Sequence, residues 1–298
     1  MSVLGILWLT QLVAVLSADP TGSVVAKVNG TAITTNDVDF AALQQGLSDE
    51  QKETDKSKLL DQLIDRQLIR AFLASKKVSP VADELQFQIA QAEDLIRKRN
   101  EDPVKVLAKI GYTPERLKAE LGLPLAWQVY ARQTITAEQI KAYFQGHKQE
   151  LDGTQLRVSQ IFLKLPKPAA DSQIAEKKAT LNALRDEITK GKQTFSDAAK
   201  AHSEAPTRNE GGDVGLIGWR GKLPPTVSKT AFDLKVGDVS EPIESPFGIH
   251  LIKVTERHPG DFSLEDVRTV ILDRLSQQLW TDTVAKERTS AKIERPKS

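Results

Sequence analysis

Cysteine is absent from this chain of 298 residues, histidine occurs only four times, and neither sign of charge is in clear excess. Without cysteine the chain has no disulfide, no lipid-modified cysteine and no thiolate nucleophile. Four scattered histidines without cysteine give no metal-ligand spacing, so we predict no metal site. The 41 basic and 40 acidic residues create no overall field toward nucleic acid or acidic lipid. We therefore expect neither a nucleic-acid partner nor a cofactor, and partners that are recognised locally.

An apolar run long enough to span a bilayer is also missing. The longest one, Val3 to Leu16, has about 14 residues, fewer than the ~18 of a spanning helix, and the small residues Ser17 and Ala18 follow it. This pattern predicts a signal peptide over residues 1–18 and export to the periplasm or cell envelope, although no Lys or Arg precedes the run. A retained segment would be a membrane anchor, the one membrane contact that we expect.

A hairpin followed by helices is predicted for the first half of the chain. Asn29-Gly30 separates two short apolar runs and accepts positive φ at both turn positions, so residues 23–34 should form a two-stranded ribbon. From residue 35 to residue 133 the pattern is helical. One face of this segment carries regularly spaced apolar residues: Leu60, Leu63, Ile64, Leu68 and Phe72.

Hydroxyl residues followed by proline predict two helix starts, because a hydroxyl caps the helix and proline suits its first position. They are Ser79-Pro80, with a helix from about Val81, and Thr113-Pro114, with a helix from about Glu115. A third helix is expected from Thr136 to about Lys148, since Thr136 and Gln139 have capping-box spacing.

A last helix is predicted after Pro259-Gly260, where Ser263 can cap it. Its apolar residues recur every four positions: Val267, Ile271, Leu275 and Leu279. This stripe must be buried, and the N-terminal helical segment is the natural partner.

The stretch from Gln155 to Arg257 has a different texture and carries the chemistry. A strand-like run, Leu156 to Leu163, opens it, and a glycine-rich turn, Gly211 to Gly215, leads to an apolar strand around His250. The turn follows a helix and lacks a Lys-Ser or Lys-Thr pair, so a structural turn is favoured over a phosphate cradle. His202-Ser203-Glu204 is no hydrolase triad, because adjacent side chains on one element do not face one another.

Five short motifs occur here in a distinctive order: Gly211-Gly212-Asp213-Val214-Gly215, Arg220-Gly221-Lys222-Leu223, Ala231-Phe232-Asp233-Leu234, Val236-Gly237-Asp238-Val239-Ser240 and Gly248-Ile249-His250-Leu251-Ile252. In this order they resemble the parvulin-type peptidyl-prolyl cis-trans isomerases, over about a third of the chain. The resemblance implies an FKBP-like βα domain with a small antiparallel sheet. It also implies catalysis of rotation about X-Pro bonds.

The resemblance also implies a site. The expected catalytic residues are His250, Gln160 and Ser245, and the expected walls of the proline pocket are Ile217, Leu223, Val227 and Phe247. Two positions depart from the family pattern: Gln160 replaces the first of two paired histidines, and Ala205 stands where an Asp or Cys is usual. Gln160 can hydrogen-bond to His250, but the glutamine side chain cannot itself gain or lose a charge as a histidine can. Rotation needs no proton transfer, so we expect weakened catalysis rather than none.

The order of these parts resembles the SurA and PrsA folding factors, and the opening Val24 to Gly30 with its downstream helix is similar to EpsD, an isomerase family linked to exopolysaccharide export. The implied fold class is α+β. The implied parts are a signal peptide (1–18), a helical SurA N-like chaperone domain (19–152), the parvulin domain (153–258) and a C-terminal helix that packs on the helical domain (259–298).

The leading hypothesis is an extracytoplasmic peptidyl-prolyl isomerase and folding chaperone, whose partners are unfolded or extended polypeptides that contain proline. One alternative is a parvulin-domain chaperone with weak or no turnover. Another is an accessory subunit of an exopolysaccharide or protein export system.

Overall fold

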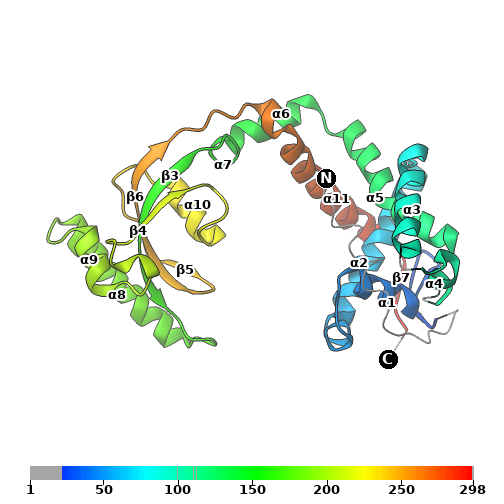
Figure 1. Cartoon of the computed structure of the whole chain (residues 1–298), viewed down its shortest axis with the longest axis horizontal. Coiled ribbons are helices and arrows are strands. Elements are labelled where there is room, and N and C mark those ends of the chain that lie inside the picture. The colour runs from blue at the N-terminus through cyan, green and yellow to red at the C-terminus, as the bar shows by residue number, and fades with distance from the viewer. Residues whose placement is uncertain (1–21, 99, 110, 112, 297–298) are drawn as a thin grey trace. The chain divides into compact units, whose positions relative to one another are not determined.

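The computed structural model describes residues 22–98, 100–109, 111 and 113–296, and these form two compact units (Figure 1). Unit 1 contains the described residues up to Thr136 and from Leu272 onward, and unit 2 contains residues 137–271. These limits differ from the boundaries near residues 153 and 259 that the sequence predicts. The predicted signal peptide, residues 1–18, lies outside the described residues.

Unit 1 opens with a β-hairpin, as the Asn-Gly signal predicts. Strands β1 (Val24–Val28) and β2 (Thr31–Thr34) are antiparallel, and the turn residues Asn29 and Gly30 have φ of 50° and 86°. Strand β7 (Ile293–Glu294) pairs with the other edge of β1. Segments from both ends of the chain therefore share one three-stranded sheet.

Five helices follow the hairpin: α1 (Thr35–Gln44), α2 (Asp49–Ser75), α3 (Ala82–Arg97), α4 (Pro103–Lys109) and α5 (Pro114–Thr134). Helix α5 starts as predicted, because the Thr113 hydroxyl accepts a hydrogen bond from the Arg116 backbone N at 3.2 Å. The predicted cap of α3 is wrong: Val81, not Ser79, is the N-cap residue. Pro80 lies beside α5, because a Cβ added at Gly122 would be in ordinary contact with the Pro80 Cγ, at 3.5 Å.

Helix α11 (Leu264–Ser290) is the predicted C-terminal helix, and Ser263 Oγ accepts a hydrogen bond from the Asp266 backbone N at its start. Its second half belongs to unit 1, where Val284 shares a core with α2 and α5. The rings of Trp280 and Trp127 meet edge to face at 5.0 Å, and Trp127 Nε1 donates a hydrogen bond to Ser276 Oγ at 3.0 Å. The part of the apolar stripe around Leu279 is thus covered by residues of the N-terminal helices, whereas Val267 and Ile271 belong to unit 2.

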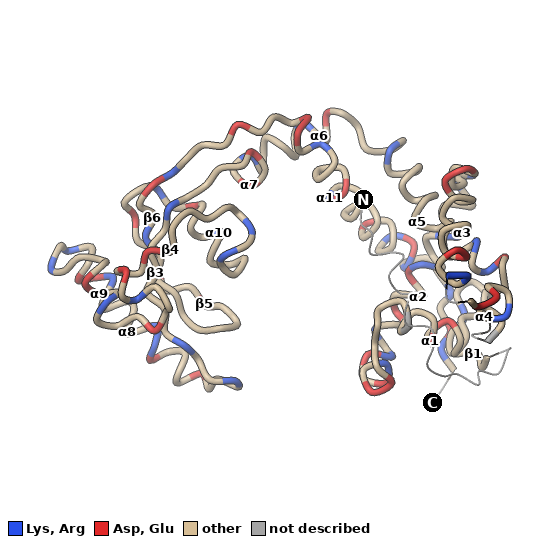
Figure 2. Tube along the Cα trace, in the orientation of Figure 1, with Lys and Arg blue, Asp and Glu red and all other residues tan. Residues whose placement is uncertain are grey.

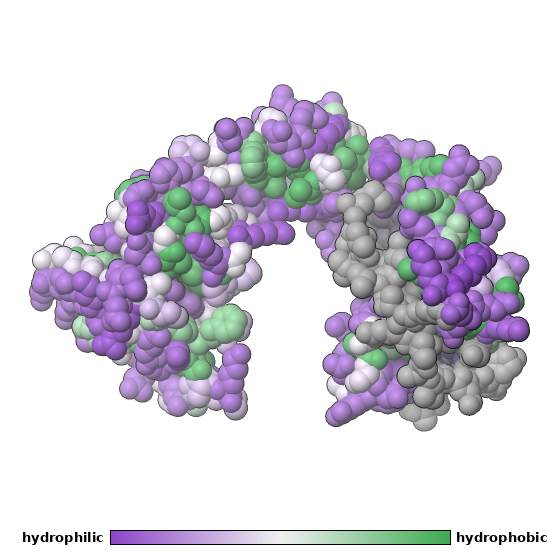
Figure 3. Space-filling view, in the orientation of Figure 1, coloured by the Kyte–Doolittle hydropathy of each residue, from purple (hydrophilic) through white to green (hydrophobic). Residues whose placement is uncertain are grey.

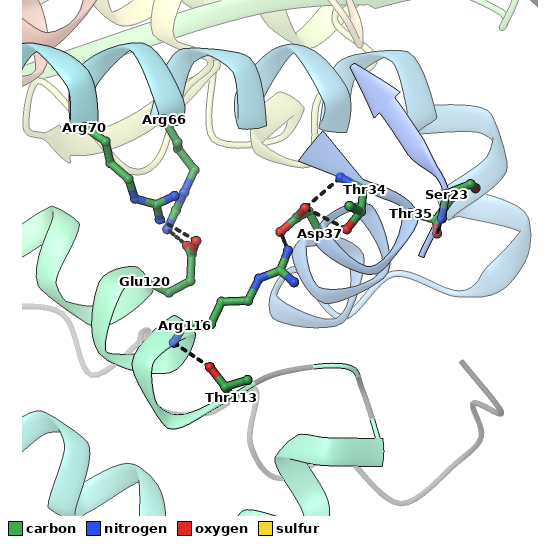
Figure 4. A network of polar contacts seen from close by, with 9 residues as sticks. All are labelled: Ser23, Thr34, Thr35, Asp37, Arg66, Arg70, Thr113, Arg116 and Glu120. Carbon is green, nitrogen blue, oxygen red and sulfur yellow. Dashed lines mark hydrogen bonds and ion pairs between the residues drawn. The ribbon is translucent and has the colours of Figure 1, made fainter. Parts of the chain in front are cut away.

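A buried ion cluster joins the helices of unit 1 (Figure 4). Glu120 on α5 is 8% exposed and accepts hydrogen bonds from the Arg66 and Arg70 guanidinium groups of α2. Burial raises the pKa of Glu120, but the two guanidinium groups outweigh it and hold the pKa below its ordinary value. A second pair, Arg116 with Asp37, joins α5 to α1. The carboxylate of Glu120 thus stays ionised inside the unit.

Unit 2 surrounds a four-stranded antiparallel sheet of order β4-β3-β6-β5. Its elements are α6 (Ala137–Gly146), α7 (Lys148–Leu151), β3 (Gln155–Lys164), α8 (Asp171–Thr189), α9 (Phe195–His202), a 3-10 turn η3 (Pro206–Arg208), β4 (Asp213–Ile217), α10 (Pro225–Asp233), β5 (Ile243–Ser245), β6 (Gly248–His258) and the start of α11. Helix α7 belongs with this unit, because Gln149 accepts a hydrogen bond from Arg257 and the backbone O of Asp152 accepts one from Phe262 N.

The two faces of this sheet have separate cores, because side chains alternate along each strand. One face packs on α8 and α9 through Ile161, Leu163 and the β6 residues Ile249 and Leu251. The other face packs on α10, where Phe232 contributes to a core with residues of β3, β4 and β6. Both cores are closed by helices, and the residues discussed below lie on the α10 face.

Neither sign of charge dominates the described residues in the view of Figure 2. Basic and acidic residues are interspersed along both units (Figure 2), and apolar residues form small patches between hydrophilic ones in the view of Figure 3. Among the described helices, none has the length and apolar character that crossing a bilayer requires.

Candidate active site

A chain of three hydrogen-bonded side chains lies at the end of the β3-β6 pair. Ser245 Oγ lies 2.8 Å from His250 Nε2, and His250 Nδ1 lies 3.3 Å from Gln160 Oε1. The Phe162 and His250 rings also contact each other, with centroids 4.6 Å apart. The structure therefore brings together the three residues for which the sequence predicts a catalytic role.

Strand register explains why these residues meet. Phe162 of β3 pairs directly with His250 of β6, and Gln160 lies two residues earlier, on the same face of β3. Gly248 permits the close approach of the strands at this end, because its φ is +151° and a Cβ there would lie 2.2 Å from Leu163 O. Ser245 lies near His250 because the short strand β5 pairs with β6 and places Ser245 opposite Gly248.

His250 is a neutral imidazole at physiological pH. Its side chain is 4% exposed, and burial lowers its pKa to about 4, because the charged ring would lose its hydration. Both tautomers are satisfied. With the proton on Nδ1, the ring donates to Gln160 Oε1 and accepts from Ser245; with the proton on Nε2, it donates to Ser245 Oγ, whose hydroxyl turns to the Gly248 carbonyl at 3.2 Å. The Gln160 amide then presents its NH₂ group.

The corner after α9 supports the part of β3 that extends beyond its pairing with β4. Ser203 Oγ accepts hydrogen bonds from the backbone N of Phe162 at 3.1 Å and of Ala205 at 3.2 Å. Glu204 donates its backbone N to Phe162 O at 2.7 Å and accepts from Lys164 N at 2.6 Å through Oε2. Ser203 and Glu204 thus fix the strand that carries Gln160 and Phe162.

A cavity of about 450 Å³ opens beside His250. Its lining consists of Gln160, Phe162, Ala205, Pro206, Gly221, Lys222, Leu223, Pro224, Phe247 and His250. The side of the cavity near α10 is aliphatic, through Leu223, and Phe247, 58% exposed, stands at its rim. The lining is therefore largely apolar, with Gln160, His250 and Lys222 as its polar side chains.

Two of the predicted pocket residues lie elsewhere. Ile217 and Val227 are 1% and 0% exposed and belong to the core between the sheet and α10, not to the cavity lining. Ile217 pairs with Leu156 at the far end of β3, which places it away from His250. Leu223 and Phe247 do line the cavity.

Several lining residues were missed from the sequence: Phe162, Pro206, Lys222 and Pro224. Phe162 carried a usable signal, because a residue two positions after Gln160 on a strand faces the same side. Pro206 lies in the short turn η3, and Lys222 and Pro224 lie in the loop before α10; the paths of such segments depend on tertiary packing and not on local periodicity.

Unit 1 contains a second, separate cavity of about 340 Å³. It is lined by Arg66, Leu123, Pro124, Trp127, Gln128, Asp273, Ser276, Gln277 and Trp280. Arg66 also belongs to the Glu120 cluster, so one wall of this cavity is held by the ion pair.

Comparison with known proteins agrees with the geometry of unit 2. Residues 161–256 match the PPIC-type PPIase domain of the rotamases. Foldase protein PrsA of Bacillus subtilis is 30% identical over 184 residues, which cover 61% of this chain and 56% of that protein. Chaperone SurA of Chromobacterium violaceum is 37% identical over 124 residues, which cover 40% of this chain and 28% of that protein. The chain thus matches about half or less of the length of these relatives.

Among solved structures, the peptidylprolyl isomerase PrsA from Bacillus cereus is 21% identical with a TM-score of 0.49, over 93% of this chain and 95% of that chain. The family match contains Ser245, His250 and the turn between Gly211 and Gly215, and it begins one residue after Gln160. Residues 161–256 are therefore a PPIC-type peptidyl-prolyl isomerase domain, in a chain that is similar to PrsA foldases and SurA chaperones.

Proposed function

We propose that this chain is a peptidyl-prolyl cis-trans isomerase and folding chaperone for unfolded, proline-containing polypeptides outside the cytoplasm. The observation that carries the proposal is the neutral Gln160–His250–Ser245 chain beside a largely apolar cavity. The match of residues 161–256 to the PPIC-type domain supports the same reaction.

The geometry suits rotation about an X-Pro bond. The barrier of ~18–20 kcal/mol comes from conjugation between the imide nitrogen and the carbonyl, and it falls when that conjugation weakens. Leu223 and Phe247 offer apolar surface for the proline ring. The imidazole and amide of His250 and Gln160 can donate to or accept from a carbonyl that changes direction during rotation. No proton is transferred, so a neutral histidine is sufficient.

Two substitutions favour a second candidate, a chaperone with slow turnover. Gln160 occupies the place of a histidine, and Ala205 replaces a polar residue in the cavity lining. The cavity then has fewer groups that can stabilise a twisted imide than the family pattern provides. Peptide binding would persist in such a protein, because the apolar walls are intact.

Isomerisation can be measured without a coupling protease by exchange NMR on a short Ala-Xaa-Pro-Phe peptide with catalytic amounts of the chain. We expect cis-trans exchange faster than in buffer, and His250→Ala should lower the rate at least tenfold, since one of the polar groups at the carbonyl is lost. His202→Ala, an exposed site on α9, serves as the matched control. A rate equal to buffer, together with suppressed aggregation of an unfolded client, would favour the second candidate.

Export is tested by mass spectrometry of the N-terminus in protein recovered from the producing cells. Cleavage near Ala18 is the expected result, because Val3 to Leu16 has the length of a signal-peptide core. An intact N-terminus in a cytoplasmic fraction would contradict the proposed location.

A further inference from the structure

The cavity beside His250 has an uneven charge. Of its ten lining residues, Lys222 is the one with a formal charge at neutral pH, because burial keeps His250 neutral and Ala205 contributes no carboxylate. A ligand that enters this cavity meets a positive group and no negative one in the lining. The formal charge of the lining is thus of one sign.

Lys222 is also available for a ligand. It is exposed, and no ion pair joins its ammonium group to a carboxylate among the described residues. Its neighbour Arg220, two residues earlier in the same loop, is different, since its guanidinium lies 3.8 Å from a Glu150 carboxylate oxygen. One cation of the loop is thus paired inside unit 2, and the other is left at the cavity.

Two acidic residues that adjoin site residues in the sequence, Glu204 beside Ala205 and Glu244 beside Ser245, are engaged elsewhere. Glu204 accepts from the Lys164 backbone N at 2.6 Å, and Glu244 pairs with Lys178 at 2.9 Å. On the Phe247 side of the cavity, Lys167 adds another cation, with its Nζ 5.3 Å from the Phe247 ring centroid. Positive charge thus lies on two sides of the opening.

We propose that Lys222 is a specificity-determining residue that selects proline segments in which an acidic residue directly adjoins the proline. The inference rests on the proposed isomerase function and names the substrate class of that site. Consecutive Cα atoms lie 3.8 Å apart across a trans peptide and ~2.9 Å across a cis one, so a neighbouring Glu stays near the cavity in both isomers. Lys222 directly precedes Leu223 in this protein. A ligand proline that contacts Leu223 therefore brings the Glu beside it close to Lys222.

The test compares three peptides, Ala-Glu-Pro-Phe, Ala-Gln-Pro-Phe and Ala-Lys-Pro-Phe, and the matching set with the variable residue after proline. We expect the chain to favour Glu over Gln by about two- to fivefold in kcat/KM at low ionic strength, the size of an exposed ion pair. The preference should shrink in 0.5 M salt, where screening is strong. Lys222→Gln should bring the ratio to about one, and Lys222→Glu should favour the Lys peptide.

Lys229→Gln is the matched control, because Lys229 is an exposed lysine of α10 outside the cavity lining, and it should keep the wild-type ratio. A wild-type ratio of one at both peptide positions, or a ratio that survives in Lys222→Gln, would overturn the proposal. The dissociation constants of the same peptides distinguish a failure of this proposal from a failure of the proposed isomerase function. A Glu preference in binding without turnover supports Lys222 and contradicts the isomerase, whereas turnover without preference does the reverse.

Discussion

The two units each bury a polar cluster, and the clusters are built in opposite ways. In unit 1, Glu120 is ionised and accepts hydrogen bonds from two guanidinium groups, those of Arg66 and Arg70. In unit 2, His250 is uncharged and is held by an amide and a hydroxyl. Burial opposes charge in both, but it prevails where no opposite charge is in reach, and so the pKa of His250 falls to about 4.

This difference separates a structural cluster from a site. A buried ion pair fixes its partners firmly, because losing one of them leaves an uncompensated charge. A neutral chain of groups that both donate and accept tolerates more than one arrangement. Gln160, His250 and Ser245 can exchange donor and acceptor roles, which a carbonyl that changes direction requires.

The largest effect is expected from Glu120→Ala. The variant leaves Arg66 and Arg70 without their carboxylate, and the free energy of unfolding of unit 1 should fall by about 2–4 kcal/mol, less than for fully buried partners because the arginine side chains are about 30% exposed. Urea unfolding followed by the methyl NMR signals of Ile64 and Ile69 reports on unit 1. The matched control is Glu53→Ala, an exposed ion pair of α2, with an expected loss below about 0.5 kcal/mol.

Equal losses for the two variants would mean that burial of Glu120 adds nothing to its ion pairs. Acid should act in the same direction. Because the folded pKa of Glu120 is below its ordinary value, its contribution is present above that value and is lost as the pH falls through the folded pKa.

The next effect concerns His250 and has a defined pH window. Its pKa is about 4 when folded and 6.5 as an unperturbed group, so the unfolded state binds more protons between these values. The free energy of unfolding of unit 2 should therefore fall by up to about 3 kcal/mol as the pH drops from 7 to 4. Urea unfolding at each pH, followed by the methyl signals of Ile217 and Ile252, measures it.

His250→Asn should remove this pH dependence, whereas His202→Asn, at an exposed histidine, should keep the wild-type profile. Parallel profiles for His250→Asn and the wild type would contradict the assignment of the window to His250.

Much of the fold was predictable because its signals are local. The Asn29-Gly30 turn, the Thr113 cap and the spacing of the last helix each act within a few residues, and the structure confirms all three elements. Ser79 shows the limit, since Val81 and not Ser79 is the N-cap residue of α3, and Pro80 lies close to Gly122 of α5. The ends of the compact units also depend on contacts such as Arg257 with Gln149, which no local pattern contains.

The site was only partly predictable. The residues Gln160, Ser245 and His250 were named through a family resemblance, and their contact depends on the register that pairs Phe162 with His250. Ile217 and Val227 were expected in the pocket but lie in the core, because apolar residues that line a cavity and those that fill a core have the same sequence pattern. Lys222 was missed since its proposed role depends on the charge of the cavity lining, which is known only once the lining residues are known.

A smaller effect is expected from Gln160→Ala. The variant leaves His250 Nδ1 without its partner, which should lower the free energy of unfolding of unit 2 by about 1–2 kcal/mol. Isomerisation should slow by about tenfold, while the pH window of His250 is retained. Gln155→Ala, at an exposed residue of the same strand, is the control and should change neither quantity. An unchanged rate with a lowered stability would reduce Gln160 to a structural role.

The smallest effect is expected from a pair of variants that compares the cavity wall beside His250 with the core next to it. Val227→Ala should cost about 1–2 kcal/mol of unit 2 stability, since Val227 is fully buried, and should leave the peptide dissociation constant unchanged because it lies outside the cavity lining. Leu223→Ala should weaken peptide binding by about three- to tenfold, because it removes apolar surface from the lining. Titration of both variants with an Ala-Gln-Pro-Phe peptide, after unfolding by urea has been measured, gives the two quantities. Weaker binding in Val227→Ala would show that Val227 does contact the proline, as the sequence predicts. Unchanged binding in Leu223→Ala would show that the proline ring does not bind against Leu223.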